Sequence, residues 1–128
     1  MMPFLILAAA SADLDALDQA VARCDRSAAN PVFSGEAARR SQFLLDAYRE
    51  QESIVNDRLA LADQRRTLRE AGAIKSADQK QIDLAQASLD DRQKALNDKR
   101  MLEGIRQDAM DNMRRYFLNN CPAGKSEK

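Results

Sequence analysis

The chain has no histidine and no tryptophan among its 128 residues. Histidine is the commonest metal ligand and the side chain whose ordinary pKa lies closest to neutral pH, so its absence removes the usual general base of an active site. The sequence also lacks a glycine-rich phosphate loop, a serine nucleophile elbow and any cluster of residues spaced as metal ligands. We therefore expect a protein that is not an enzyme and that carries no cofactor or metal.

Glycine, proline and aromatic residues are scarce: there are 4 glycines and 3 prolines, and aromatic side chains make up 5% of the chain. This composition favours long helices over a sheet. The 20 basic residues balance the 20 acidic residues, and the two signs are interspersed along the chain. Nucleic-acid binding requires a basic face, so we exclude nucleic acid as the main partner.

The acidic residues are interpreted as a solvated surface. Asp90 and Asp91 are neighbours, and adjacent side chains on a helix diverge by about 100°, so the two carboxylates do not share a site. Most acids have a base nearby at helical spacing. The surface pairs expected on this basis are Asp90 with Lys94, Glu36 with Arg40, and Asp111 with Arg115.

Apolar residues recur every seven positions on both sides of a short turn near residue 74. The first set is Ala47, Ile54, Leu61 and Leu68, and the second is Ile82, Leu89 and Leu96. The numbers of facing residues sum to 150, which pairs Leu68 with Ile82, Leu61 with Leu89, and Ile54 with Leu96. Seven-residue repeats that face each other in reverse order are typical of an antiparallel, coiled-coil-like hairpin. We therefore predict an all-α fold built on a long helical hairpin.

We expect one helical domain over residues 13–121, with a short helix followed by the two arms of the hairpin. The predicted helices span residues 13–28, 36–71 and 77–119. The final residues, 122–128, are small and charged and are expected to form a disordered tail.

Local signals set these boundaries. Pro31 should end the first helix, because the residue before a proline avoids helical backbone angles, and residues 31–35 should form a linker. Ser34 is the expected N-cap of the second helix, and Gly72 is placed to follow its last turn. The stretch from Ser76 to Gln79 has the pattern of a capping box that starts the third helix.

The two cysteines should meet at the base of the hairpin, which is the end that holds the chain termini. The register places Cys121 opposite residue 29, about one helical turn from Cys24. A disulfide between Cys24 and Cys121 would close a loop of nearly a hundred residues, which is worth up to about 4–5 kcal/mol in the chain-entropy model. The alternative is a pair of small buried apolar side chains in a reducing cytoplasm.

Residues 1–12 are a short apolar run that ends in the small-residue site Ala10-Ser11-Ala12. This pattern resembles the end of a secretory signal peptide, although no basic residue precedes the run. The run is shorter than the roughly 20 apolar residues of a membrane-spanning helix, so we expect no integral membrane segment once it is removed. Alternatively, these residues begin a helix of a cytoplasmic protein.

Apolar residues are unevenly distributed along the predicted hairpin. The base collects most of the aromatic residues, several methionines and both cysteines, and the first helix should pack there. The distal half, roughly residues 53–95, carries a second apolar stripe that two helices cannot bury. We expect this stripe to contact a protein partner or a second copy. The candidate contact residues are Val55, Arg58, Leu59, Ala62, Arg65 and Leu84.

The long helical hairpin resembles the arms of periplasmic chaperones of the Skp family, but this chain lacks a β-rich segment for trimer formation. The resemblance is one of shape and transfers no residue. The leading hypothesis is a non-catalytic bacterial protein, periplasmic or secreted, that acts as a protein-binding adaptor or a holdase-like chaperone. The alternatives are a cytoplasmic coiled-coil partner of a secretion or motility apparatus, and a protein inhibitor of an enzyme.

Overall fold

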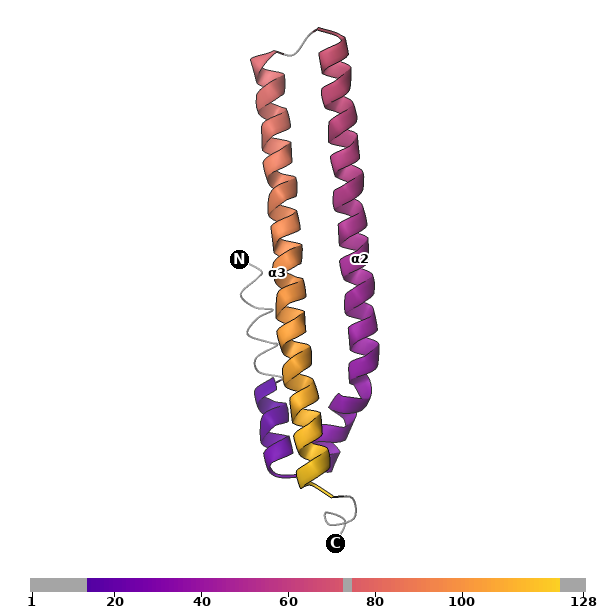
Figure 1. Ribbon diagram of the computed structural model, residues 1–128, viewed down its shortest axis with the longest axis vertical. Coiled ribbons are helices and arrows are strands. Elements are labelled where there is room, and N and C mark those ends of the chain that lie inside the picture. Colours follow the sequence, from indigo (N-terminus) through magenta and orange to yellow (C-terminus); the bar gives the residue numbers. More distant parts are fainter. Residues whose placement is uncertain (1–13, 73–74, 123–128) are drawn as a thin grey trace. The chain divides into compact units, whose positions relative to one another are not determined.

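The computed structural model describes residues 14–72 and 75–122, and these residues form helices joined by turns. An N-terminal helix over residues 14–22 is followed by α2, Arg26–Glu70, and α3, Ser76–Asn120 (Figure 1). The predicted all-α class and helical hairpin are confirmed. The expected signal segment, residues 123–128 of the expected tail, and residues 73–74 of the hairpin turn lie outside the described residues. Within the described ranges, no helix is both long and apolar enough to cross a membrane.

The chain divides into two compact units, and both long helices pass through each of them. The terminal unit comprises Met1–Ser41 and Glu103–Lys128, and the central unit comprises Gln42–Leu102. The expectation was a single helical domain. Each unit pairs a segment of α2 with an antiparallel segment of α3.

The N-terminal helix ends earlier than predicted, at residue 22 rather than 28. Cys24 adopts the left-handed conformation with φ of 53°, and the Asp25 amide donates to the carbonyl of Ala20 at 2.8 Å. The Cys24 amide donates to the carbonyl of Val21 at 3.1 Å. These two bonds form a Schellman motif, which satisfies the last carbonyls of a helix and turns the chain away. The position is usually glycine, so the sequence held no standard stop signal here.

The long helix α2 begins at Arg26 and continues through Pro31, so the predicted linker at 31–35 is wrong. The Asp25 carboxylate caps the helix by accepting bonds from the Ala28 amide at 3.2 Å and the Ser27 hydroxyl at 2.8 Å. Pro31 lies in the second turn of α2, where it removes the backbone hydrogen bond to the carbonyl of Ser27 and its ring crowds that carbonyl. Ser34 is not an N-cap, because its hydroxyl donates to the Asn30 carbonyl inside the helix.

The other end of α2 follows the prediction more closely. Gly72 has φ of 64°, and its amide donates to the carbonyl of Arg69 at 3.1 Å, as expected for a glycine that follows the last helical turn. Helix α3 then begins at Ser76 itself. The predicted capping box is not the observed cap, because the Gln79 amide donates to the Lys75 carbonyl and its side chain donates to Asp83.

The core of the terminal unit joins all three helices. Leu17, Ala20 and Val21 of the N-terminal helix pack with residues of α2 and α3, which confirms that the short helix covers this part of the hairpin. The ring of Phe33 lies 5.7 Å from that of Phe117, measured between centroids. Such a tilted pair adds about 0.5–1.5 kcal/mol beyond the area it buries. The remaining buried members of this core are Ala29, Met110, Phe117 and Cys121.

The core of the central unit is a seam two helices wide. Ala47, Ile54 and Leu96 form one buried cluster with Phe43 against it, which confirms the predicted pairing of Ile54 with Leu96. Ile82 and Leu89 are also buried on α3, whereas Leu61 and Leu68 on α2 are half-buried. Polar bridges flank the seam. They include Gln51 with Gln93, Arg58 with Asp90, and Arg65 with Gln86.

Candidate functional site

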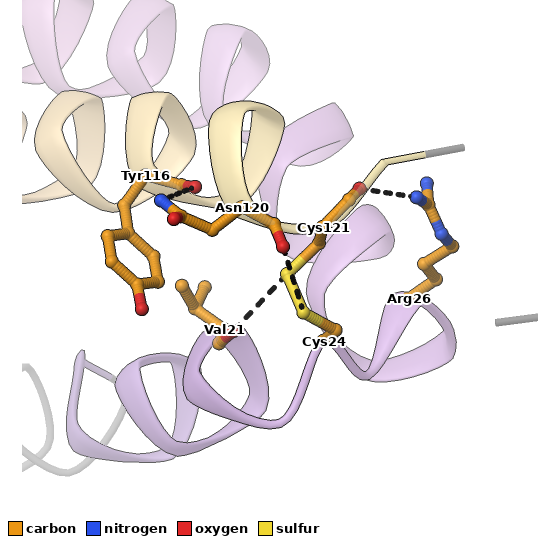
Figure 2. The surroundings of a disulfide bond; sticks show 6 residues. All are labelled: Val21, Cys24, Arg26, Tyr116, Asn120 and Cys121. Atoms are coloured by element: carbon orange, nitrogen blue, oxygen red, sulfur yellow. Dashed lines mark hydrogen bonds between the residues drawn. A yellow bond between two sulfur atoms is a disulfide. The ribbon is translucent and has the colours of Figure 1, made fainter. Parts of the chain in front are cut away.

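Cys24 and Cys121 lie at disulfide distance, with their Cα atoms 5.4 Å apart (Figure 2). This separation is within the range that a disulfide requires, and the predicted pairing of the two residues is confirmed. The described residues contain no other cysteine. The pair connects the turn after the N-terminal helix to the end of α3, 97 residues away along the chain.

The surroundings of the disulfide are largely backbone. The Cys121 sulfur lies 3.7 Å from the carbonyl oxygen of Val21, and the Cys24 sulfur lies 3.8 Å from that of Asn120. Arg26 donates to the carbonyl of Cys121 and its guanidinium lies 5.5 Å from the ring centroid of Phe117. No side chain in this set could act as a base toward a thiol. The arrangement therefore fits a structural cross-link.

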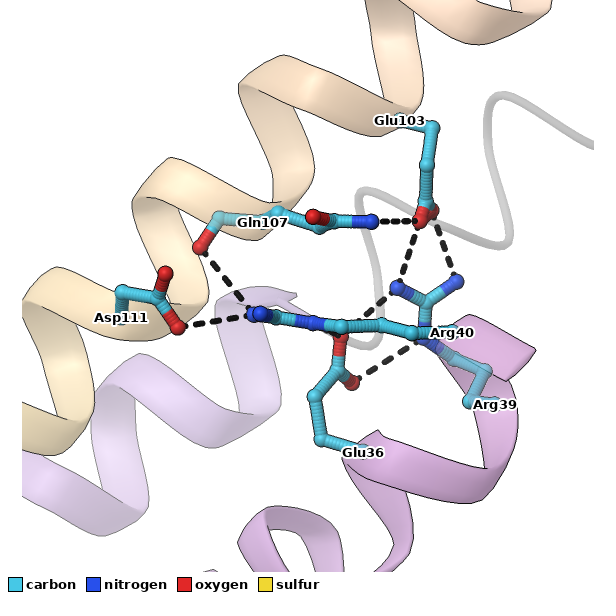
Figure 3. A network of polar contacts seen from close by, with 6 residues as sticks. All are labelled: Glu36, Arg39, Arg40, Glu103, Gln107 and Asp111. Atoms are coloured by element: carbon cyan, nitrogen blue, oxygen red, sulfur yellow. Dashed lines mark hydrogen bonds and ion pairs between the residues drawn. The ribbon is translucent and has the colours of Figure 1, made fainter. Parts of the chain in front are cut away.

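A buried polar layer lies between α2 and α3 in the terminal unit (Figure 3). Glu36 and Glu103 are only 8% and 7% exposed, the two buried charged residues among the described part of the chain. Arg39 lies between them. It donates to both Glu36 oxygens, at 2.7 and 3.0 Å, and to both Glu103 oxygens, at 2.8 Å each. One guanidinium thus holds two carboxylates from different helices in a bidentate geometry.

Further polar groups complete this layer. Arg40 donates to Glu36 at 3.0 Å and to Asp111 at 2.8 Å, and it also contacts the backbone carbonyl of Gln107. The Gln107 side chain donates to Glu103 at 3.0 Å. Three acids face three bases, so the layer is electrically neutral. Its charged members are Glu36, Glu103, Asp111, Arg39, Arg40 and Arg106.

The two carboxyl groups stay ionised in this layer. Burial raises the pKa of Glu36, but the hydrogen bonds that Arg39 and Arg40 donate to its carboxylate together lower the pKa by more. The pKa of Glu36 therefore lies below its ordinary value. Burial likewise raises the pKa of Glu103, and hydrogen bonds from Arg39 and Gln107 outweigh it. The charge of Arg106 lowers the pKa of both carboxyl groups. The hydrogen bonds that Arg39 donates to Glu36 and Glu103 in turn raise the pKa of Arg39.

Glu36, Asp90 and Asp111 are predicted from the sequence to lie on a solvated surface, and for Glu36 that prediction is wrong. The Glu36–Arg40 contact forms, but Glu36 is buried. Asp111 bonds to Arg40, and Asp90 bonds to Arg58 on the other helix. One available signal was missed. Glu103 occupies the seven-residue row of α3 that otherwise consists of the buried apolar residues Ile82, Leu89, Leu96, Met110 and Phe117.

The candidate contact residues of the central unit are exposed where they are apolar. Val55 and Leu59 are 46% and 61% exposed. They continue a row with spacings of three and four residues along one face of α2. We call this row the α2 stripe, and its apolar members are Leu45, Tyr48, Val55, Leu59 and Ala62, all exposed. Leu45 and Tyr48 extend the stripe beyond the residues predicted from the sequence.

The other three candidates are arranged differently. Arg58 bonds to Asp90 and Arg65 bonds to Gln86, so both arginines close one flank of the seam. Leu84 is 56% exposed on α3. Counted at about 100° per residue from the buried Ile82 and Leu89, it lies away from the flank that Arg58 and Arg65 close. Leu84 therefore does not belong to the α2 stripe.

A surface hollow in the terminal unit was not predicted. It lies between the N-terminal helix and α3 and contains one carboxylate and one phenol. Its lining residues are Asp18, Val21, Ala22, Asn112, Met113 and Tyr116. These side chains include no nucleophile paired with a base. Across the described ranges, no group of three or more acidic or cysteine side chains is positioned to hold a metal ion.

The apolar residues that are predicted to gather at the base are only partly buried. Met110 and Phe117 are buried in the terminal core, but Ile105 and Tyr116 are exposed. The exposed residues Leu44 and Tyr48 of α2 and Met101 of α3 belong to the central unit.

Comparison of the chain with known protein families, with curated proteins and with solved structures finds no significant match to any of them.

Proposed function

We propose that the protein is a non-catalytic, protein-binding module, and that the α2 stripe is its contact surface. The observation that carries the proposal is the exposure of Leu45, Tyr48, Val55 and Leu59 along one helix face. A row of large apolar side chains exposed on one helix face is uncommon on a protein that has no partner. In the central unit, two helices bury one seam between them, and this stripe lies outside it.

The spacing of the stripe indicates the kind of partner. Alternating intervals of three and four residues match the seam of a coiled coil, so an amphipathic helix with the same spacing could pack against it. Glu52 lies within the stripe between Tyr48 and Val55, and its side chain is exposed. A partner helix would therefore place a basic residue opposite Glu52. That requirement would fix the register of the complex, as a polar seam residue does.

The proposed role is that of an adaptor or a holdase-like chaperone in the bacterial periplasm. Tyr48 offers a large aromatic contact, which suits both a helix and an unfolded client. The disulfide distance between Cys24 and Cys121 supports an oxidising compartment, since disulfides persist there and are rare in the cytoplasm. The mass of the protein purified from the periplasm tests the location, because export predicts that residues 1–12 are removed.

The test of binding is the double substitution Val55→Glu and Leu59→Glu in the full chain. Self-association is measured by sedimentation velocity, and chaperone activity by light scattering of thermally unfolded citrate synthase. We expect both to be lost in the variant while its melting temperature stays unchanged. The matched control is Leu118→Glu, which places a charge at an exposed leucine of the terminal unit and should change neither assay.

Two results would contradict the proposal. If the double variant associates and protects the client as well as the parent chain does, the α2 stripe is not the contact surface. If neither protein associates or protects in these assays, the holdase role is wrong. An adaptor role would then require that a synthetic amphipathic helix, with leucine at the stripe spacing and lysine opposite Glu52, binds the parent chain and not the variant.

A further inference from the structure

We propose that the buried layer of Glu36, Arg39 and Glu103 selects the register in which α2 and α3 pair in the terminal unit, and thereby brings Cys121 to Cys24. The layer has three features that a packing element does not need. It is charged, it is buried, and one arginine joins carboxylates from both helices. Polar seam residues of this kind are the best attested means of fixing register in coiled coils.

The apolar rows cannot fix this register by themselves. The buried residues of α3 repeat every seven positions, and so do the seam residues of α2 from Ala47 to Leu68. In the central unit, a shift of α3 by seven residues therefore puts apolar side chains against apolar side chains again. Glu103 is the one charged member of the α3 row, so it distinguishes the observed register from its neighbours.

A seven-residue shift separates the two sides of the layer. The helical rise moves Glu103 by about 10 Å, which breaks all its bonds with Arg39. Seven positions away in the row stand Leu96 in one direction and Met110 in the other, each within an apolar cluster. The carboxylate of Glu103 would leave Arg39 and enter these apolar clusters, and the one base beside the position of Met110, Arg40, already bonds to Glu36 and Asp111. An unpaired buried charge is strongly unfavourable, so both shifted registers are disfavoured.

The same shift separates the cysteines. The Cα atoms of Cys24 and Cys121 are 5.4 Å apart, and a disulfide cannot form when this distance exceeds about 7 Å. A displacement of about 10 Å along α3 exceeds that tolerance. The layer must therefore form in the reduced chain before the cross-link can close, and the disulfide then retains the register that the layer has selected.

The layer is better suited to selecting a register than to adding stability. Removing two carboxylates from water is costly, and the bonds from Arg39 and Arg40 offset that cost without a large surplus. Arg106 also has a buried Nη1 atom with no hydrogen-bond partner. Apolar side chains of similar size at 36, 39 and 103 should thus give a reduced protein at least as stable, but with several registers of similar energy.

Oxidation by glutathione disulfide reports the register. The thiolate of one cysteine attacks glutathione disulfide, forms a mixed disulfide and releases one molecule of glutathione. The thiolate of the other cysteine then attacks the protein sulfur of the mixed disulfide and releases a second glutathione. The two cysteines lose two electrons and two protons, and glutathione disulfide is reduced. The equilibrium constant is the effective concentration of one thiol at the other.

The experiment compares the parent chain with the triple variant Glu36→Leu, Arg39→Met and Glu103→Leu, each full length and at low micromolar concentration. The proportion of reduced, mixed and cross-linked protein is measured by mass spectrometry in glutathione buffers. We expect the reduced variant to be as helical as the parent by circular dichroism, and its effective thiol concentration to fall at least tenfold. The matched control is Glu50→Leu, Asp57→Leu and Arg92→Met.

That control removes an arginine that also bridges two carboxylates, but on an exposed flank of the central unit. Arg92 donates to Glu50 at 3.1 Å and to Asp57 at 2.7 Å. The effective thiol concentration of the control variant should equal that of the parent chain. An unchanged effective thiol concentration in the variant Glu36→Leu, Arg39→Met and Glu103→Leu would overturn the proposal. Loss of helix in the reduced variant would also overturn it, because the layer would then be needed for stability.

A second measurement reads the register without the cysteines. In the background Cys24→Ser and Cys121→Ser, spin labels are attached at Ala37→Cys and Asp108→Cys, two exposed positions of the terminal unit. Double electron–electron resonance should give one distance with the layer intact. In the background that also carries Glu36→Leu, Arg39→Met and Glu103→Leu, it should give two or more. A single distance in both proteins would contradict register selection.

Discussion

The terminal and central units use the same pair of long helices and bury them to different extents. In the terminal unit, a third helix and a disulfide cover the pair, and the largest core of the described residues results. In the central unit, the described residues show two helices, a narrow seam and polar bridges along its flanks. The difference shows that a heptad row is enough to pair two helices, whereas burial of a second stripe requires another element.

The largest expected effect is the loss of the cross-link. Replacing Cys24 and Cys121 by serine should lower the free energy of unfolding by about 4 kcal/mol, because the closed loop is long. Hydrogen exchange should show faster amide exchange in the terminal unit and little change in the central unit. Equal acceleration in both units would mean that they unfold together, and the comparison would fail.

Truncating a seam residue should cost more free energy of unfolding the more deeply that residue is buried. Ile54→Ala should cost about 3–4 kcal/mol, since Ile54 is fully buried, whereas Leu61→Ala should cost about 1–2 kcal/mol because Leu61 is half-buried. Chemical denaturation of both variants measures the two values. A larger loss for Leu61 would show that the seam is buried further toward the turn, by a partner or a second copy.

Acidification should weaken the terminal unit through its polar layer. The pKa values of Glu36 and Glu103 lie below their ordinary value of 4.5, so the stabilisation is complete above that pH and is lost as the pH falls through the lowered values. Denaturation between pH 6 and pH 2 measures this dependence. The variant Glu36→Gln with Glu103→Gln should show a shallower decline, and an identical slope would mean that other acids dominate.

The smallest effect on stability is expected at the α2 stripe. Val55→Glu and Leu59→Glu together should change the free energy of unfolding by less than about 1 kcal/mol, because both side chains are exposed. Thermal denaturation at low protein concentration measures it. A loss of several kcal/mol would show that these residues are covered in solution, and the central unit would then not differ from the terminal unit in burial.

The pairing of the helices could be predicted from the sequence because it depends on periodicity. The row from Ile82 to Leu96 fixes which face of α3 is buried, and the position of the turn then predicts the pairing of Ile54 with Leu96 in the central unit. Cys24 and Cys121 followed from the same arithmetic. Gly72 was predictable because a left-handed residue after a helix is usually glycine.

Other features depend on contacts that no local pattern reveals. Pro31 predicts a helix stop, but the cap at Asp25, six residues earlier, places Pro31 inside α2. Glu36 has a base four residues later, which is typical of an exposed pair, and its burial depends on Glu103 in the other helix. Tyr48 is one of the aromatic residues expected near the base of the hairpin, but it is exposed on the face of α2 that points away from the seam.

Cys24 has two structural roles. Its backbone makes the left-handed turn that ends the N-terminal helix, and its sulfur makes the cross-link. A side chain in that conformation costs about 1 kcal/mol relative to glycine, so the position is a compromise between the two roles. Related chains that abandon the cross-link should accordingly differ at their two cysteine positions. Glycine is the favoured replacement at 24, whereas a small apolar residue suits the buried site at 121.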